Sequence, residues 1–219
     1  VWFATNNGVS CWNVKTNEWR TYFDNKSDNA QVFLSLCEDK KGNIWAGTYS
    51  SGVHVIDGTT GKESVYYSKE RQNSALTNNF IFDIFEDSDG DLWLGGPIGN
   101  IFCYNVSKNK FKEYPSLPVY VFAELSPNKI LLGCTLGLCL LDKETEVFEI
   151  LLDGYIVHDI LVIGDDVWLG TSGDGLLSFN IHNKSVKKYT TKSGLTSNYV
   201  NSVFQEKESL WLGTENGLC

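Results

Sequence analysis

A tryptophan-centred phrase returns along the chain and limits the folds that it can adopt. The phrases IWAGT, LWLGG, VWLGT and LWLGT repeat one pattern, and the same slot recurs in six places. Leu131 fills one slot, and tryptophan fills the others: Trp2, Trp45, Trp93, Trp168 and Trp211. Successive slots lie 37 to 48 residues apart. A period of about 40 residues is typical of a solenoid or a propeller, so the content of one unit has to decide between them.

Each unit contains four short segments with strand character. In one of them, the alternating run QVFLSLCED is followed by the turn DKKGN, the tryptophan segment IWAGT, the segment GVHVID and finally SVYY. Alternation of β-branched and aromatic residues predicts strands, and Gly and Asp permit the tight turns between them. No apolar spacing of a helical repeat is sustained. Four antiparallel strands per unit therefore predict the blades of a β-propeller.

We predict one all-β propeller segment, residues 1–219, with four complete blades and a partial blade at each end. The expected ranges are 1–23 (partial), 31–67, 79–114, 119–151, 155–190 and 199–219 (partial). Both end segments contain the tryptophan strand, so they cannot merge into one blade, and the ring needs at least six blades. We expect the tryptophans to be buried at equivalent positions between blades, with the following glycine admitting a close backbone approach. The third strand ends on Asn or Asp, which can bond the next turn: Asn13, Asp57, Asn105, Asp142 and Asn180.

Charge and composition limit the partners. The formal net charge of -9 argues against binding to nucleic acid and to an anionic membrane surface, because the chain has no basic stripe. The longest apolar run, ILLGCTLGLCLL, is too short and too rich in glycine to span a bilayer. Val1 is not an initiator and Met is absent, so we interpret the chain as a piece of a longer protein.

The titratable residues do not form a chemical motif. The six cysteines contain no C-x-x-C, and we interpret them as buried free thiols. Disulfide formation in an oxidising compartment remains an alternative. Cysteines at repeated strand positions, however, lie a blade apart, which is too far for a direct bond. The stretch EDSDGD (86–91) lacks the glutamate of a calcium loop and is interpreted as a hairpin turn. His54, His158 and His182 stand apart from nucleophile motifs. We predict no catalytic residue, no metal site and no cofactor.

The blades resemble the two-component regulator propeller repeat. Residues 33–53, 78–96 and 197–218 carry its succession of an acidic pair, a turn, a Leu-Trp or Ile-Trp pair and a glycine turn. The resemblance covers essentially the whole chain, and the unit with Leu131 and Cys134 departs most from the pattern. It implies the periplasmic, ligand-sensing part of an inner-membrane hybrid two-component sensor histidine kinase, which responds to a glycan-derived oligosaccharide or other small ligand. It also implies a seven-bladed ring, with further blades, a second propeller and an immunoglobulin-like domain in the parent chain. A homodimer of the parent sensor stays open.

The loops carry the candidate binding site. Linkers between blades and the turns after the tryptophan strands share the face on which propellers usually bind ligands. The richest linker is 68–79, which contains Arg71 and Asn73 and is flanked by the turns with Tyr49 and Asn100. An aromatic ring for stacking and Arg and Asn donors would suit a glycan, and the acidic balance favours a neutral one. The alternative is a solvated loop without a ligand.

Two other classes of function stay open. The stretch VIDGTTGKESVYY (55–67) is similar to a turn of quinoprotein dehydrogenase blades, which would make the chain a propeller enzyme. One blade alone carries the T-G-K of that turn, so we expect no catalysis by this segment. A protein-interaction scaffold is the third class, since a propeller fold by itself does not decide function.

Overall fold

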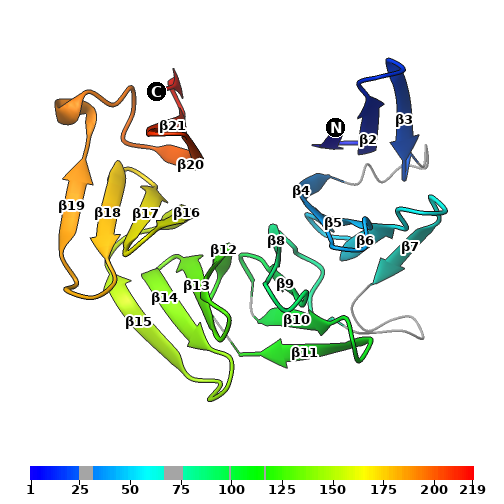
Figure 1. The fold of residues 1–219 in the computed structure, drawn as a ribbon, viewed down its shortest axis with the longest axis horizontal. Helices are drawn as coiled ribbons and strands as arrows, with labels where there is room; N and C mark the ends of the chain where they lie inside the picture. Colours follow the sequence, from blue (N-terminus) through cyan, green and yellow to red (C-terminus); the bar gives the residue numbers. More distant parts are fainter. Residues whose placement is uncertain (25–31, 67–75, 99, 116) are drawn as a thin grey trace. The chain divides into compact units, whose positions relative to one another are not determined.

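The chain folds into six sheets of consecutive antiparallel strands, which we call blades 1 to 6 in chain order (Figure 1). The computed structural model describes residues 1–24, 32–66, 76–98, 100–115 and 117–219. Within these ranges the helical structure is one short 3-10 turn, η1 (Thr191–Ser193). The blades divide between two compact units, Val1–Pro118 and Val119–Cys219.

The first unit contains blades 1 to 3. Blade 1 consists of β1 (Trp2–Thr5), β2 (Gly8–Asn13) and β3 (Glu18–Tyr22). Blade 2 consists of β4 (Phe33–Glu38), β5 (Ile44–Thr48), β6 (Val53–Ile56) and β7 (Glu63–Tyr66). Blade 3 consists of β8 (Asp83–Glu86), β9 (Leu92–Gly95), β10 (Ile101–Asn105) and β11 (Lys110–Tyr114).

The second unit contains blades 4 to 6. Blade 4 consists of β12 (Val119–Ser126), β13 (Lys129–Cys134), β14 (Gly137–Asp142) and β15 (Phe148–Asp153). Blade 5 consists of β16 (Val157–Ile163), β17 (Asp166–Thr171), β18 (Leu176–Asn180) and β19 (Val186–Tyr189). Blade 6 consists of β20 (Val200–Glu206), β21 (Ser209–Thr214) and β22 (Gly217–Leu218).

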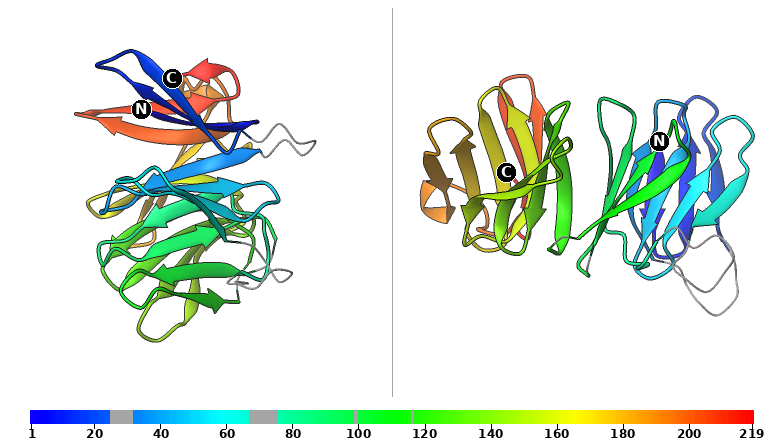
Figure 2. Two further views of the ribbon diagram at one scale, coloured as in Figure 1. Left: turned by 90° about the vertical axis from the view of Figure 1, so that its right-hand side faces the viewer. Right: turned by 90° about the horizontal axis from the view of Figure 1, so that it is seen from below.

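Each strand pairs with its neighbour in the chain, and Figure 2 shows the blades as twisted sheets. The prediction of an all-β propeller is confirmed. The predicted seven-bladed ring is not matched, because the chain forms six blades of three or four strands. The sequence contains six copies of the tryptophan slot, and the number seven came from the family resemblance alone.

The tryptophans of blades 2 and 3 are buried, as predicted. Trp45 and Trp93 are 4% and 1% exposed. The Trp45 ring stacks on Tyr66 of its own blade, with 5.9 Å between ring centroids, and approaches Tyr104 of blade 3 at 5.0 Å. The tryptophan of one blade therefore packs against the third strand of the next, and the two rings belong to one apolar cluster.

These two indoles have carboxylate partners that the sequence analysis did not predict. Trp45 Nε1 donates to Asp39 Oδ2, and Trp93 Nε1 donates to Asp87 Oδ2, both at 2.9 Å. Both carboxylates are buried in the turn that precedes the tryptophan strand. The Glu-Asp pair of the repeat thus supplies the acceptor for the indole N–H. Blade 4 has Leu131 in the tryptophan slot and the uncharged stretch Ser-Pro-Asn in the corresponding turn.

The burial prediction is wrong for Trp211, which is 42% exposed, and Trp2 and Trp168 are half-buried. Trp168 keeps its aromatic neighbour within the blade, since its ring lies 5.8 Å from that of Tyr189. Blade 6 is the last blade of the second unit, and within that unit no following blade covers Trp211. The buried Trp45, by contrast, is covered by Tyr104 on the third strand of the following blade.

The glycine after the tryptophan permits the predicted close approach. A Cβ at Gly47 would lie 2.5 Å from Ser35 Oγ and 2.7 Å from the Ile81 carbonyl oxygen. A Cβ at Gly170 would lie 2.8 Å from the Val200 carbonyl oxygen of the next blade. Such distances leave no room for a side chain, so glycine lets the tryptophan strand lie against the start of the next blade.

Candidate ligand-binding face

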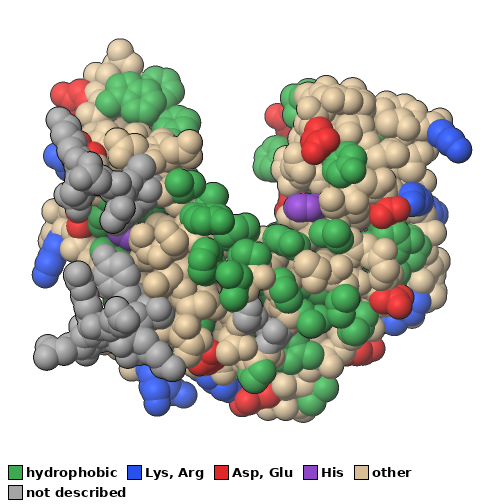
Figure 3. All heavy atoms as spheres, turned by 180° about the vertical axis from the view of Figure 1, so that it is seen from behind, with side chains coloured by type: hydrophobic (Ala, Val, Ile, Leu, Met, Phe, Trp, Pro, Cys, Tyr) green, Lys and Arg blue, Asp and Glu red, His purple; other side chains and the backbone are tan. Residues whose placement is uncertain are grey.

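Two kinds of loop meet on one face of the first unit, which we call the loop face: the linkers between blades and the turns after the tryptophan strands. The linker into blade 3 is bonded to the turn of blade 2, because Gly52 N donates to Asn79 O at 3.0 Å and Ile81 N donates to Thr48 O at 2.9 Å. Figure 3 shows Lys and Arg side chains at the outer edges of this view and hydrophobic side chains between them.

Tyr49 presents an exposed aromatic ring on the loop face. Its side chain is 53% exposed. The ring stands edge-on to Phe80, with 5.5 Å between centroids, and lies 6.2 Å from Phe82. These two rings support Tyr49 from the linker and leave part of its surface open to solvent. An open, supported aromatic ring can stack on the C–H face of a sugar.

Asn100 lies in the turn of blade 3, half-buried, and its amide Nδ2 donates to Glu113 Oε1. The Thr77 hydroxyl donates to the same carboxylate oxygen. Asn78 Nδ2 donates to the carbonyl oxygens of Ile98 and Asn100 at 3.1 and 3.4 Å. The structure thus brings Asn100 beside residues 77–80, the segment that also carries the Phe80 contact to Tyr49.

Arg71 and Asn73 lie outside the described residues, so their part in the site stays a prediction. The face that the structure describes here carries an aromatic ring, amide groups and one carboxylate, from Tyr49, Asn78, Asn100 and Glu113. This set favours hydrogen bonds with hydroxyl groups over the binding of an anion.

The second unit has a feature on its first strands that sequence reasoning missed. The rings of Tyr120 in β12 and His158 in β16 stack with 5.2 Å between centroids and 24° between planes. Each residue occupies a register shift of its strand, where a bulge re-aims the side chain. Burial lowers the pKa of His158. The sequence could have indicated this stack, because an aromatic ring occupies the same repeat position in two consecutive blades.

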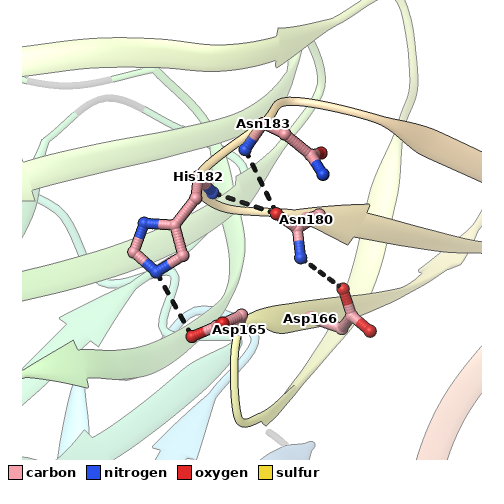
Figure 4. Close-up of polar contacts among 5 residues, drawn as sticks. All are labelled: Asp165, Asp166, Asn180, His182 and Asn183. Atoms are coloured by element: carbon pink, nitrogen blue, oxygen red, sulfur yellow. Dashed lines mark hydrogen bonds and ion pairs between the residues drawn. The ribbon is translucent and has the colours of Figure 1, made fainter.

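The opposite end of blade 5 holds the polar cluster drawn in Figure 4. Asn180 Oδ1 accepts hydrogen bonds from the backbone N–H groups of His182 and Asn183, and its Nδ2 donates to Asp166 Oδ1 at 2.9 Å. His182 Nε2 lies 3.2 Å from Asp165 Oδ1, and both side chains are exposed. The predicted role of Asn180 in bonding its turn is confirmed, and the cluster serves the turn.

The acidic stretch of blade 3 serves its turn in the same way. Asp87 accepts from the Trp93 indole and from the Asp91 backbone N–H. Lys40 of blade 2 donates through Nζ to the carbonyl oxygens of Asp87 and Ser88 at 3.1 and 2.7 Å. An ammonium group therefore lies against the carbonyl groups of this turn. Among the described residues, no group of three or more His, Cys, Asp or Glu could hold a metal ion.

No helix among the described residues is long and apolar enough to cross a membrane. Two segments, 26–50 and 75–97, match the model of the two-component regulator propeller. They cover the start and tryptophan strands of blades 2 and 3. Histidine kinase P4 of Formosa agariphila is 23% identical over 222 residues, which cover 96% of this chain and 14% of the kinase.

Solved structures share the fold. The extracellular domain of a hybrid two-component system of B. thetaiotaomicron superposes with a TM-score of 0.82 at 22% identity, over 99% of this chain and 31% of that one. PorZ, a surface component of the type-IX secretion system of Porphyromonas gingivalis, superposes with a TM-score of 0.74 at 16% identity, over 99% of this chain and 36% of that one. The chain thus spans about a third of the solved structures and a seventh of the kinase. It carries two-component regulator propeller repeats on the propeller fold of these extracellular domains.

Proposed function

We propose that this chain is the ligand-sensing propeller segment of a hybrid two-component histidine kinase. The observation that carries the proposal is the match of blades 2 and 3 to the regulator propeller repeat, on a chain related along its length to a histidine kinase. In this proposal the segment is periplasmic, the parent protein is anchored in the inner membrane, and the segment itself catalyses nothing. Glycan cleavage or quinone-dependent oxidation that a point change in this chain abolishes would contradict the last part.

The ligand in this proposal is a glycan-derived oligosaccharide, bound on the loop face of the first unit. The exposed Tyr49 ring supplies a stacking surface, and the amides of Asn78 and Asn100 supply hydrogen-bond partners. The net charge of -9 makes a neutral oligosaccharide more favourable than a sulfated one.

A glycan array on the intact ectodomain identifies the oligosaccharide, and calorimetry then measures its affinity for variants. We expect Tyr49→Ala and Arg71→Ala each to weaken binding about tenfold or more, since a stacked ring or a hydrogen bond to a charged group contributes about 1.5 kcal/mol. Phe148→Ala is the matched control, because Phe148 is an exposed aromatic on the outer strand of blade 4. Unchanged affinity in both test variants would remove this face and leave the segment as a spacer.

The likeness to PorZ favours a second candidate, an interaction scaffold at the cell surface. The two functions predict different domains in the parent protein. A membrane helix followed by a kinase domain supports the sensor, whereas their absence from the complete gene would support the scaffold. Binding of a purified oligosaccharide by the intact ectodomain would separate them further.

A further inference from the structure

Two cysteines of blade 4 lie in contact. Cys134 ends β13, Cys139 lies in β14, and their Sγ atoms are 3.5 Å apart. The strands are paired directly, with Leu132 opposite Cys139. The two side chains are 1% and 6% exposed, so the pair is held inside the blade.

Comparison with the other blades shows that Cys134 replaces a turn-closing threonine. In blades 2 and 5 the equivalent residues are Thr48 and Thr171, whose hydroxyl groups donate to Gly52 O at 2.7 Å and to Gly175 O at 2.6 Å. The Cys134 thiol makes the same bond more weakly, to Gly137 O at 3.2 Å. Closing the turn therefore requires no cysteine at this position.

Cys139 also differs from the equivalent residues of the other four-stranded blades, although blade 6 has Cys219 at this position. The equivalent residues of the other four-stranded blades are His54, Phe102 and Leu177, all of which fill the core. Blade 4 thus departs from the repeat at two positions, and both departures place a thiol at the same contact. If each substitution served packing alone, the two cysteines would have no reason to lie in contact.

We propose that Cys134 and Cys139 are a disulfide-forming pair that covalently closes the turn of blade 4. The separation of 3.5 Å has to shorten to about 2.05 Å, and because Cys134 and Cys139 are diagonal neighbours on the paired strands, closure requires side-chain rotation and a shift of the strands. The oxidant is a disulfide-bearing molecule, either a small-molecule disulfide or a thiol–disulfide oxidoreductase. Secreted and periplasmic proteins meet such oxidants.

The reaction balances as two exchange steps. Because both thiols are buried in the folded blade, the exchange requires the turn to open. The Cys134 thiolate then attacks a sulfur of the oxidant's disulfide, forms a mixed disulfide and displaces one oxidant thiolate. The Cys139 thiolate then attacks Cys134 Sγ and displaces the second. The two protein thiols lose two electrons and two protons, and the oxidant becomes two thiols.

The contact between the two thiols favours Cys134 as the first nucleophile. Either thiol can donate in this contact. With Cys139 as the donor, the bond lowers the pKa of Cys134 and raises the pKa of Cys139. Cys134 therefore forms the thiolate first. The product would fix residues 134–137, the turn whose Leu136 carbonyl oxygen accepts from Gly154 N at 2.8 Å in the linker toward blade 5.

Mass spectrometry tests the proposal on the purified chain. The reduced protein is incubated with oxidised glutathione, denatured, alkylated and digested. We expect the peptide that contains both cysteines to lose two hydrogen masses and to escape alkylation. Amide exchange across residues 134–139 should slow by tenfold or more relative to the reduced protein.

The control variants use residues that the repeat already accepts. Cys134→Thr restores the threonine of blades 2 and 5, Cys139→Leu introduces the leucine of blade 5, and either change should abolish the linkage while the fold persists. Cys103→Ser in blade 3 should leave the linkage intact. Full alkylation of both cysteines, or a stable glutathione adduct on Cys134 without closure, would overturn the proposal.

Discussion

The tryptophans of blades 2 and 3 and the tryptophan of blade 6 occupy one repeat position in opposite environments. Trp45 and Trp93 are buried, and each donates at 2.9 Å to a buried aspartate. Trp211 is 42% exposed, and its Nε1 donates at 3.2 Å to the exposed Glu206. Strand, slot and indole acceptor are thus present in all three blades.

What differs is the surface that covers the indole. Trp45 packs against Tyr104 on the third strand of the following blade. Within the second unit no following blade covers Trp211. We infer that the repeat determines where the side chain points, and that the side chains packed around the indole determine how much free energy its burial contributes. Matched substitutions at the covered and uncovered positions measure that contribution directly.

The largest difference is expected on removal of the indole. Trp93→Ala should lower the free energy of unfolding by about 3–5 kcal/mol, because the cavity lies inside a packed core. Trp211→Ala should cost less, about 2 kcal/mol, since 42% of its surface is already exposed to water. Denaturant titration followed by circular dichroism measures both. Equal costs would show that an uncovered indole contributes as much as a covered one.

The covered third strand of blade 2 also buries a histidine. His54 is 1% exposed, and burial lowers its pKa to about 4, whereas blade 6 has the exposed Cys219 at this position. In the unfolded chain His54 takes up a proton below its ordinary pKa of about 6.5, whereas in the folded protein it stays neutral down to about pH 4. The free energy of unfolding therefore falls as the pH falls below about 6.5. We expect unfolding at pH 4 to require about 3 kcal/mol less than at pH 7 on this account.

The control for the histidine is His54→Phe, since the equivalent residue of blade 3 is the buried Phe102. This variant should lose most of the pH dependence between about 4 and 6.5. An unchanged pH profile of the unfolding free energy would show that His54 is not the titrating group.

Substitutions of the carboxylates that accept from the indoles should differ less in their cost to the free energy of unfolding than substitutions of the indoles themselves. Asp39 accepts four hydrogen bonds, from the backbone of Lys41 and Asn43 and from the side chains of Asn43 and Trp45. Burial alone would raise the pKa of Asp39, but these bonds hold it below its usual range. Asp39→Asn should cost about 1.5–3 kcal/mol at neutral pH, because an amide N–H would face two donors.

The stability from Asp39 is present above the pKa of the unfolded aspartate and is lost as the pH falls through the lowered folded value. The gap between wild type and Asp39→Asn should therefore shrink in acid. Glu206→Gln in blade 6 should stay within about 0.5 kcal/mol of wild type, since water replaces its exposed bond. A gap that persists in strong acid would mean that the carboxylate charge contributes nothing.

The strands and their grouping into blades could be predicted because the signals are local. Alternation, turn glycines and the tryptophan slot all lie within one repeat. The Asn180 turn bonds were likewise available from spacing alone. The exposure of Trp211, the carboxylate partners and the Tyr120–His158 stack were not predicted. The burial and the ring stack depend on contacts between blades, and the carboxylates on how each turn folds back.

The candidate site is partly predictable for the same reason. Tyr49 and Asn100 lie on the loop face as predicted, because the position of a turn follows from its strands. Phe80, the partner of Tyr49, comes from the linker into the next blade, whose approach no single repeat specifies. Glu113, the partner of Asn100, lies on β11 of the same blade, and this contact depends on how the turn folds. Whether Tyr49 and Asn100 bind a ligand stays a prediction.

The smallest difference in unfolding free energy between a buried and a more exposed repeat position is expected at the threonine that closes the turn. Thr171 is fully buried in blade 5 and donates to Gly175 O at 2.6 Å, and Thr214 is half-buried in blade 6 and donates to Gly217 O at 2.8 Å. Valine has nearly the same shape and cannot donate. Thr171→Val should therefore cost about 1 kcal/mol, because its carbonyl partner cannot gain water in exchange. Thr214→Val should cost a few tenths of a kcal/mol, about what an exposed hydrogen bond contributes net. Thermal unfolding of the two variants compares them, and a larger loss at Thr214 would contradict the view that the covering blade sets the energy of each repeat position.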